Sequence, residues 1–282
     1  MPPDFAARAG LPDMSDEPVR TVCLRHGRIA YVLSGAGEPT VVLETGLGAE
    51  SAEWRVVRAA LARRYGVLSY DRPGRGRSDP PPAVRSAAGL ADELRDLLRA
   101  VSAPGPYLLV GHSFGGLLVR TFAERYRADV CGLVLAESMH ARQFDLFAGA
   151  FDDADVPESP ERSRMRAFWT GGWRDPEATP ERIDLEASLR ESAGFSSLGE
   201  LPVTVVTANA FARSRLFPDA SRGSLQARWD GLQHDLLRCS ARAVHISVPA
   251  SEHFVQRDAP QALVEAIVAT IGRMRASRGE GV

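Results

Sequence analysis

Residues 110–116 read Val110-Gly111-His112-Ser113-Phe114-Gly115-Gly116, and this stretch decides the fold. The apolar run 107–110 leads into it, and a helical pattern over residues 117–124 follows it. A Gly-x-Ser-x-Gly turn between a strand and a helix is the context of a nucleophile elbow. Such a turn is so tight that side chains at Gly111 and Gly115 would collide with neighbouring backbone.

The elbow predicts a nucleophile at Ser113. We expect this serine in strained backbone geometry, with its hydroxyl exposed at the end of the sheet and at the positive end of a helix. The amide of Phe114 is then free to donate a hydrogen bond to an oxyanion. The same pattern can arise by chance in a chain with 25 glycines. The strand before it and the helix after it favour the functional interpretation.

The composition is that of an ordinary globular protein of 282 residues, enough for one α/β domain with an insertion. A formal net charge of -2 gives no reason to expect nucleic acid or an anionic membrane as a partner. All 34 basic residues are arginine, which excludes lysine as a Schiff-base former or general base.

The cysteines and the N-terminus predict a location. Cys23, Cys131 and Cys239 are isolated in the sequence, which argues against a disulfide framework or a zinc site and fits a reducing compartment. Residues 1–18 lack the basic start and apolar core of a signal peptide, so a flexible arm is expected there. No apolar run approaches membrane-spanning length. We therefore expect a cytoplasmic protein without membrane insertion.

Strand-like and helix-like segments alternate along the chain. The expected strands are 21–24, 29–33, 40–44, 67–70, 107–110, 130–136, 201–207 and 243–248. The expected helices of the core are 51–64, 90–98, 117–124, 224–239 and 260–274. This alternation predicts an α/β fold with a parallel sheet covered by helices on both faces.

Residues 139–200 interrupt the alternation and are predicted to form an inserted helical cap, which leaves 19–138 and 201–276 as the core. The segment carries many charges, no clear strand and seven large aromatic residues. These are Phe144, Phe147, Phe151, Phe168, Trp169, Trp173 and Phe195. The aromatic residues favour the lining of an apolar pocket, and ordinary surface helices are the alternative.

A serine nucleophile needs a base, and six histidines are candidates. Five are disfavoured by their places in the chain: His26 in a hairpin, His112 in the sharp turn, His140 at the start of the cap, His234 in a helix and His245 in a strand. His253 lies in a loop just after an expected parallel strand, at the sheet edge where active sites of such folds gather. We expect His253 to be the base, and a surface loop histidine is the alternative.

The acid that orients the base is expected at the same edge. Glu137 follows the strand 130–136, one strand away from Ser113. The next strand, 201–207, is followed by no carboxylate until Asp219. Position therefore favours Glu137, with Asp219 as the alternative acid. Glu137 could instead cap a helix or form a salt bridge.

A second oxyanion donor is expected from the loop after strand 40–44. Gly46-Leu47-Gly48 can bring a backbone amide close to a substrate. We expect the amide of Leu47 to act together with that of Phe114. Each such donor typically contributes about 3 kcal/mol in the transition state.

Four motifs together resemble those of the α/β-hydrolase superfamily. They are Gly111-His112-Ser113-Phe114-Gly115-Gly116, Asp71-Arg72-Pro73-Gly74-Arg75-Gly76-Arg77-Ser78, Thr45-Gly46-Leu47-Gly48 with Trp54 beyond it, and Ser251-Glu252-His253-Phe254. The resemblance implies an eight-stranded, mostly parallel sheet with an inserted cap, no cofactor and no metal. Members usually carry His-Gly where this chain has Thr45-Gly46. Many place the acid after the seventh strand. A subset resembling haloalkane dehalogenases and certain lactone hydrolases places it after the sixth, which matches Glu137.

The sequence thus predicts a serine hydrolase that cleaves a carboxylic ester or lactone through an acyl-enzyme, with an apolar small molecule as its substrate. A serine nucleophile counts against dehalogenase or epoxide hydrolase chemistry. The enzymes of the superfamily that perform these reactions use a carboxylate as the nucleophile. The same triad also serves amidases, carbon–carbon bond hydrolases and acyltransferases. A non-catalytic ligand-binding protein on the same scaffold is the alternative from another class. The residues expected to line the pocket are Trp54, Phe168, Trp169, Trp173 and Phe254.

Overall fold

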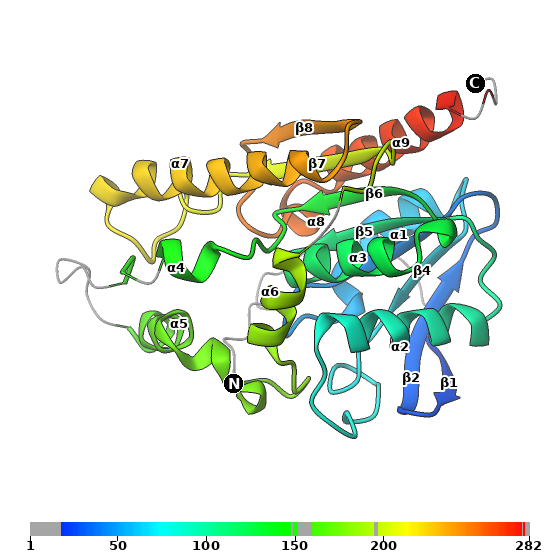
Figure 1. Ribbon diagram of the computed structural model, residues 1–282, viewed down its shortest axis with the longest axis horizontal. Coiled ribbons are helices and arrows are strands. Elements are labelled where there is room, and N and C mark those ends of the chain that lie inside the picture. Colours follow the sequence, from blue (N-terminus) through cyan, green and yellow to red (C-terminus); the bar gives the residue numbers. More distant parts are fainter. Residues whose placement is uncertain (1–17, 148, 152–158, 195–196, 278, 280–282) are drawn as a thin grey trace.

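A single eight-stranded sheet forms the centre of the molecule (Figure 1). The computed structural model describes residues 18–147, 149–151, 159–194, 197–277 and 279. The strand order is β1-β2-β4-β3-β5-β6-β7-β8. The pairs β1·β2 and β2·β4 are antiparallel, and all the other neighbours are parallel. The expected eight-stranded, mostly parallel α/β fold is therefore confirmed.

The strands follow the apolar runs of the sequence closely. They are β1 (Arg20–Leu24), β2 (Gly27–Ser34), β3 (Thr40–Glu44), β4 (Val67–Tyr70), β5 (Tyr107–His112), β6 (Val130–Ala136), β7 (Val203–Ala208) and β8 (Ala243–Val248). β3, β4, β6 and β7 are buried at every position, as parallel strands covered on both faces must be.

Helices pack on both faces of the sheet. The helices of the core are α1 (Arg55–Leu61), α2 (Ala87–Ala100), α3 (Phe114–Arg125), α7 (Asp219–Asp235), α8 (Val255–Asp258) and α9 (Pro260–Ser277). One apolar cluster joins the sheet to α2 and α3, through side chains such as Leu94 and Phe122. A second cluster on the other face joins it to α1 and α9, through Val57 and Ile267. The two clusters fix the sheet between its helices.

Two helices differ most from their expected bounds. The helix expected at 51–64 is a 3₁₀ turn, η1 (Ser51–Trp54), followed by α1, which ends at Leu61. The helix expected from residue 224 begins at Asp219, directly after Pro218 in extended conformation. A proline just before a helix already has a fixed φ and no N–H to satisfy, so the chain can start the helix there.

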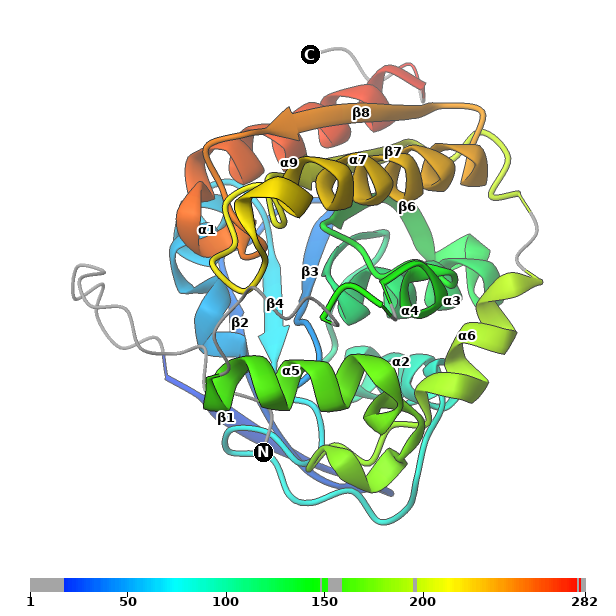
Figure 2. The same ribbon diagram turned by 90° about the vertical axis from the view of Figure 1, so that its left-hand side faces the viewer.

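The inserted segment, residues 139–200, connects β6 to β7. It contains α4 (Gln143–Phe147), α5 (Pro160–Thr170), α6 (Leu185–Ala193) and two 3₁₀ turns, η3 (Gly172–Arg174) and η4 (Pro176–Ala178). In the described part of the segment, strand pairing is limited to an isolated bridge between Ile183 and Arg85. Figure 2 shows α4, α5 and α6 in front of the sheet when it is viewed end-on. Phe195 and residues 1–17 lie outside the described residues.

Candidate active site

The turn after β5 has the geometry of a strained elbow. Ser113 has φ 53° and ψ -119°, between the last residue of β5 and the first residue of α3. A Cβ at Gly111 would lie 2.3 Å from the carbonyl oxygen of Gly115, and a Cβ at Gly115 would lie 2.5 Å from that of Glu44. Both positions therefore require glycine. A non-glycine residue at this φ and ψ costs of order 1–3 kcal/mol, which the surrounding structure must offset.

Backbone hydrogen bonds fix the elbow to the end of β6. The Ser113 N–H donates to the Ala136 carbonyl at 3.1 Å, and the Met139 N–H donates to the Ser113 carbonyl at 2.8 Å. The Ser113 side chain is half-buried. Within the described part of the chain, no group forms a hydrogen bond with its hydroxyl. The hydroxyl is thus held at the sheet edge and left available.

Glu137 lies at that edge, directly after β6, and its side chain is fully buried. Its carboxylate accepts the Ala208 N–H at 2.6 Å and the Trp229 indole N–H at 3.0 Å to each oxygen. His253 Nδ1 lies 3.4 Å from Glu137 Oε2. This distance is long for a hydrogen bond, and such contacts often tighten only once a substrate is bound. The carboxylate is oriented toward the imidazole by two fixed donors.

Asp219, the alternative acid, lies elsewhere. It is the first residue of α7, its side chain is 89% exposed, and it pairs with Arg222. The structure therefore brings Glu137, and not Asp219, to His253.

The loop of His253 is tied to the elbow through His112. His112 Nε2 lies 2.8 Å from the His253 carbonyl oxygen, and the two imidazole rings are 4.7 Å apart. A carbonyl only accepts, so His112 carries its proton on Nε2. Burial of the ring, together with the nearby His253, holds the pKa of His112 well below its usual value. A neutral His112 thus joins the nucleophile turn to the loop that supplies the base.

The other histidines contact groups away from Ser113. His140 Nε2 lies 3.1 Å from Asp235, and His245 Nε2 lies 2.9 Å from the Thr207 hydroxyl. His234 Nδ1 lies 2.8 Å from the backbone oxygen of Asp230. His26 lines a small cavity beneath the sheet edge.

The loop after β3 runs against the nucleophile. A Cβ at Gly46 would lie 3.3 Å from the Ser113 Cβ and 3.0 Å from His112 Nδ1, so the backbone of this loop passes close to the elbow. The Ala49 N–H donates to the Gly46 carbonyl at 3.3 Å and closes a turn around Leu47. Within the described residues, neither the Leu47 N–H nor the Phe114 N–H donates a hydrogen bond. Both amides are available to a ligand.

A buried ionic cluster lies beside this loop. The Arg72 guanidinium, 1% exposed, contacts Glu44 at the end of β3 and Glu181 of the inserted segment. The Tyr70 hydroxyl donates to the Glu44 carboxylate at 2.5 Å. Burial alone would lower the pKa of Arg72, and the two carboxylates raise it above its usual value. Burial raises the pKa of Glu44 in spite of the attraction of Arg72.

The expected pocket residues fall into three groups. Trp54 has no exposed surface and packs in the core between the sheet and α1, so its placement on a pocket wall is wrong. Trp173 is buried and stacked on Phe144, with ring centroids 4.3 Å apart. Phe168 and Trp169 are half-buried against the same Phe144 ring. These three aromatic side chains thus pack on Phe144 of the same segment.

Phe254 is the expected pocket residue that lies beside the catalytic candidates. Its ring centroid is 5.2 Å from that of His112 and 5.3 Å from that of His253. The Arg257 guanidinium covers its ring at 3.6 Å.

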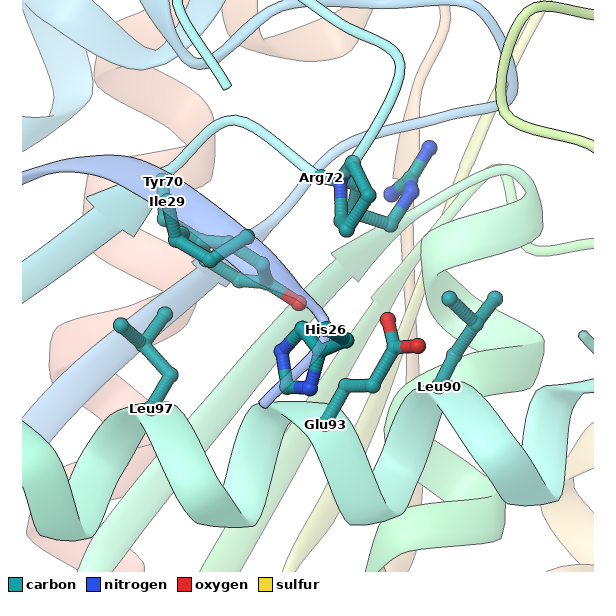
Figure 3. A pocket seen from close by; sticks show the side chains of 8 residues that line it. His26, Ile29, Tyr70, Arg72, Leu90, Glu93 and Leu97 are labelled. Carbon is teal, nitrogen blue, oxygen red and sulfur yellow. The ribbon is translucent and has the colours of Figure 1, made fainter. Parts of the chain in front are cut away.

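A cavity below the ionic cluster is too small for an organic substrate (Figure 3). It has room of about 10 Å³ for the centre of a water molecule. Its lining residues are His26, Ile29, Tyr70, Arg72, Pro73, Leu90, Glu93 and Leu97. His26 Nδ1 and one oxygen of Glu93 are buried there without a hydrogen-bond partner, which suits one ordered water.

The part of the chain that the structure describes holds neither a metal-binding cluster nor a membrane-spanning helix. That part of the chain contains no group of three or more His, Cys, Asp or Glu side chains able to hold a metal ion. None of the helices in it is long and apolar enough to cross a bilayer.

Sequence patterns missed three side chains that hold the site. Trp229 and Gln233 of α7 are one helical turn apart, and Gln233 makes two hydrogen bonds with the backbone of Ser138. Their i, i+4 spacing marks a shared buried face, but it does not show which carboxylate that face meets. The sequence places Arg72 in a Gly- and Pro-rich stretch, where a charged residue is usually solvated, so its buried contacts could not be predicted.

Comparison with known proteins supports the fold. Residues 39–176 match a family model described as alpha/beta hydrolase fold. The uncharacterized protein YqjL of Bacillus subtilis is 27% identical over 227 residues, which cover 80% of this chain and 81% of YqjL. Together with the sheet order and the elbow, the family-model match shows that the chain has the α/β-hydrolase fold.

Solved structures share the fold. A thermophilic esterase from Thermogutta terrifontis superposes with a TM-score of 0.60 at 18% identity, covering 91% of this chain and 99% of the esterase. The epoxide hydrolase CorEH superposes with a TM-score of 0.62 at 17% identity, covering 92% of this chain and 99% of CorEH. One fold therefore carries different chemistries, and the side chains of the site must decide between them.

Proposed function

We propose that the protein is a serine hydrolase that cleaves a carboxylic ester or a lactone through an acyl-enzyme. One observation carries this proposal: Ser113 stands in a strained elbow at the sheet edge where Glu137 contacts His253. A nucleophile, an orienting acid and a base in this chain order are those of α/β-hydrolases. A hydroxyl rather than a carboxylate at the nucleophile position favours acyl transfer over attack on an alkyl carbon.

The roles follow from hydrogen-bonding chemistry. The Nδ1–H of His253 donates a hydrogen bond to the Glu137 carboxylate. The basic lone pair of the imidazole is then on Nε2. His253 takes the Ser113 proton as the hydroxyl attacks the carbonyl carbon, and it then protonates the leaving alcohol. Water then attacks the acyl carbon and loses a proton to His253. His253 returns that proton to the Ser113 oxygen as the bond to the acyl carbon breaks and the acid leaves.

The charge that develops on the carbonyl oxygen needs fixed donors. The Leu47 and Phe114 amides lack other acceptors among the described residues, and the backbone of Gly46 approaches Ser113. We assign the oxyanion hole to these two amides. Two donors of this type supply roughly 6 kcal/mol of transition-state stabilisation.

The inserted segment would act as the cap over this site. The half-buried rings of Phe168 and Trp169, together with Phe254 beside His253, favour an apolar acyl or alcohol group. Three free cysteines in the described chain support a reducing, cytoplasmic location.

Hydrolysis of p-nitrophenyl esters tests this function. We expect turnover by the native protein and a loss of roughly 10⁴-fold or more in Ser113→Ala. Ser102→Ala is a matched control, because Ser102 also has a positive φ, 51°, but follows α2. Equal activity of Ser113→Ala and the native protein would contradict the proposed mechanism.

A further inference from the structure

The loop that carries Leu47 is held by side chains outside it. Arg72 donates to the Thr45 carbonyl at 2.7 Å, to the Thr45 hydroxyl at 3.1 Å and to the Gly46 carbonyl at 2.6 Å. Glu181 accepts the Gly48 N–H at 2.5 Å. The backbone groups on both sides of the Leu47 amide are therefore bound to this pair of side chains.

Arg72 and Glu181 come from opposite sides of the site. Arg72 follows β4 of the core, and Glu181 belongs to the inserted segment between η4 and α6. Arg72 Nε donates to Glu181 Oε1 at 2.7 Å, and both side chains are at most 1% exposed. The inserted segment thus reaches the oxyanion loop through one buried ion pair.

Stability alone does not account for this pair. Two carboxylates and one guanidinium are removed from water, and apolar replacements of a buried ion pair are often at least as stable. What the charges do provide is direction, since Arg72 presents a planar fork of donors to fixed acceptors. The Arg72 guanidinium also lies 5.5 Å from the ring centroid of Phe114, the second proposed oxyanion donor.

We infer that Arg72 and Glu181 are positioning residues that set the Leu47 amide against the nucleophile, so that the inserted segment contributes to oxyanion stabilisation. This inference rests on the serine-hydrolase function proposed above. The Gly48 N–H bond to Glu181 turns the loop, and Gly48 has the φ of 75° that such a turn needs. Thr45 stands where the family usually has histidine, and its hydroxyl supplies an extra acceptor for Arg72.

The test is Glu181→Gln, assayed with an ester substrate and with an aryl trifluoromethyl ketone, which forms a hemiketal oxyanion on the serine. We expect kcat and the affinity for the ketone to fall together by about tenfold or more, with KM changed less than twofold. Glu181→Asp keeps the charge but shortens the reach to the Gly48 N–H. It should show the same parallel loss.

Glu93→Gln is the matched control. Glu93, on α2, pairs with Arg85 at 3.0 Å in another buried ion pair. Arg85 donates to Glu181 only at its backbone carbonyl, at 2.6 Å, so Glu93→Gln leaves the Glu181 carboxylate and its bond to the Gly48 N–H in place. It should leave kcat and ketone affinity within twofold of the native protein. A change in KM alone, an equal effect of Glu93→Gln, or failure of both Glu181 variants to fold would overturn the inference. No ester turnover by the native protein would instead contradict the proposed function.

Discussion

Two glutamates at the same edge of the sheet are both fully buried, yet their surroundings differ. Glu44 ends β3 and faces the permanent charge of Arg72 and the hydroxyl of Tyr70. Glu137 follows β6 and faces two neutral N–H donors and the titratable ring of His253. Arginine stays protonated, so a carboxylate paired with it does not control the position of a proton. A carboxylate that faces histidine selects which ring nitrogen carries the proton. Their partners therefore distinguish the structural glutamate, Glu44, from Glu137, the proposed catalytic acid.

The largest effect should come from Glu137→Gln. The amide cannot hold His253 in the tautomer that accepts the Ser113 proton, so kcat should fall about 10³- to 10⁴-fold with little change in melting temperature. Steady-state ester hydrolysis and thermal unfolding measure both. Asp219→Asn, at an exposed position, is the control and should be fully active. The reverse result would move the acid to Asp219.

Glu44→Gln should invert this pattern. Removing one charge from a buried pair costs about 3–5 kcal/mol, part of which the remaining Glu181 offsets. The loss should appear in the free energy of unfolding in urea, with kcat lowered less than Glu137→Gln lowers it. A Glu44→Gln protein of native stability and no activity would erase the distinction between the two glutamates.

Trp229→Phe sharpens the comparison from the donor side. It removes the indole N–H that contacts both Glu137 oxygens while keeping most of an aromatic ring in its cluster with Phe147 and Phe211. The carboxylate loses a hydrogen bond that fixes its orientation toward His253, so kcat should fall about tenfold. Thermal unfolding separates this effect from misfolding. An unchanged kcat would show that the Ala208 N–H alone orients the carboxylate.

The smallest expected effect concerns His112. The pKa of His112 is well below its usual value because burial keeps the ring neutral, whereas the unfolded chain takes up the proton near pH 6.5. The stability that this group contributes is therefore present above pH 6.5 and is lost as the pH falls.

Between pH 7 and pH 6 the loss is about 0.7 kcal/mol for one such histidine. Urea unfolding at the two pH values should show this difference to be larger in the native protein than in His112→Gln. Equal pH dependence would mean that His112 titrates in the folded protein as it does in the unfolded chain.

The fold was predictable because strands and helices carry their own periodicity. The buried runs of β3, β6 and β7 left little choice of element, and the elbow fixed where the sheet ends. Ser113 was predicted from the Gly-x-Ser-x-Gly turn between a strand and a helix, and Glu137 and His253 were predicted from their places after expected strands. Which strand ends lie side by side follows from the sheet order, and that order brings the expected residues to one edge.

The rest depends on side-chain direction across distant segments. Trp54 looked like a pocket residue from its place after the oxyanion loop, but the 3₁₀ turn η1 directs it into the core. Arg72 and Glu181 are 109 positions apart in the sequence, and no local sequence pattern predicts their contact. Periodicity predicts elements, whereas pairings between loops emerge only when the chain is folded.

The most direct test of the account is labelling with a fluorophosphonate, followed by peptide mapping. The native protein should gain one adduct, on the peptide that contains Ser113. Glu137→Gln should label far more slowly, and Ser113→Ala should not label at that peptide at all. An adduct on another residue, or equal labelling rates for Glu137→Gln and the native protein, would contradict a triad of Ser113, His253 and Glu137.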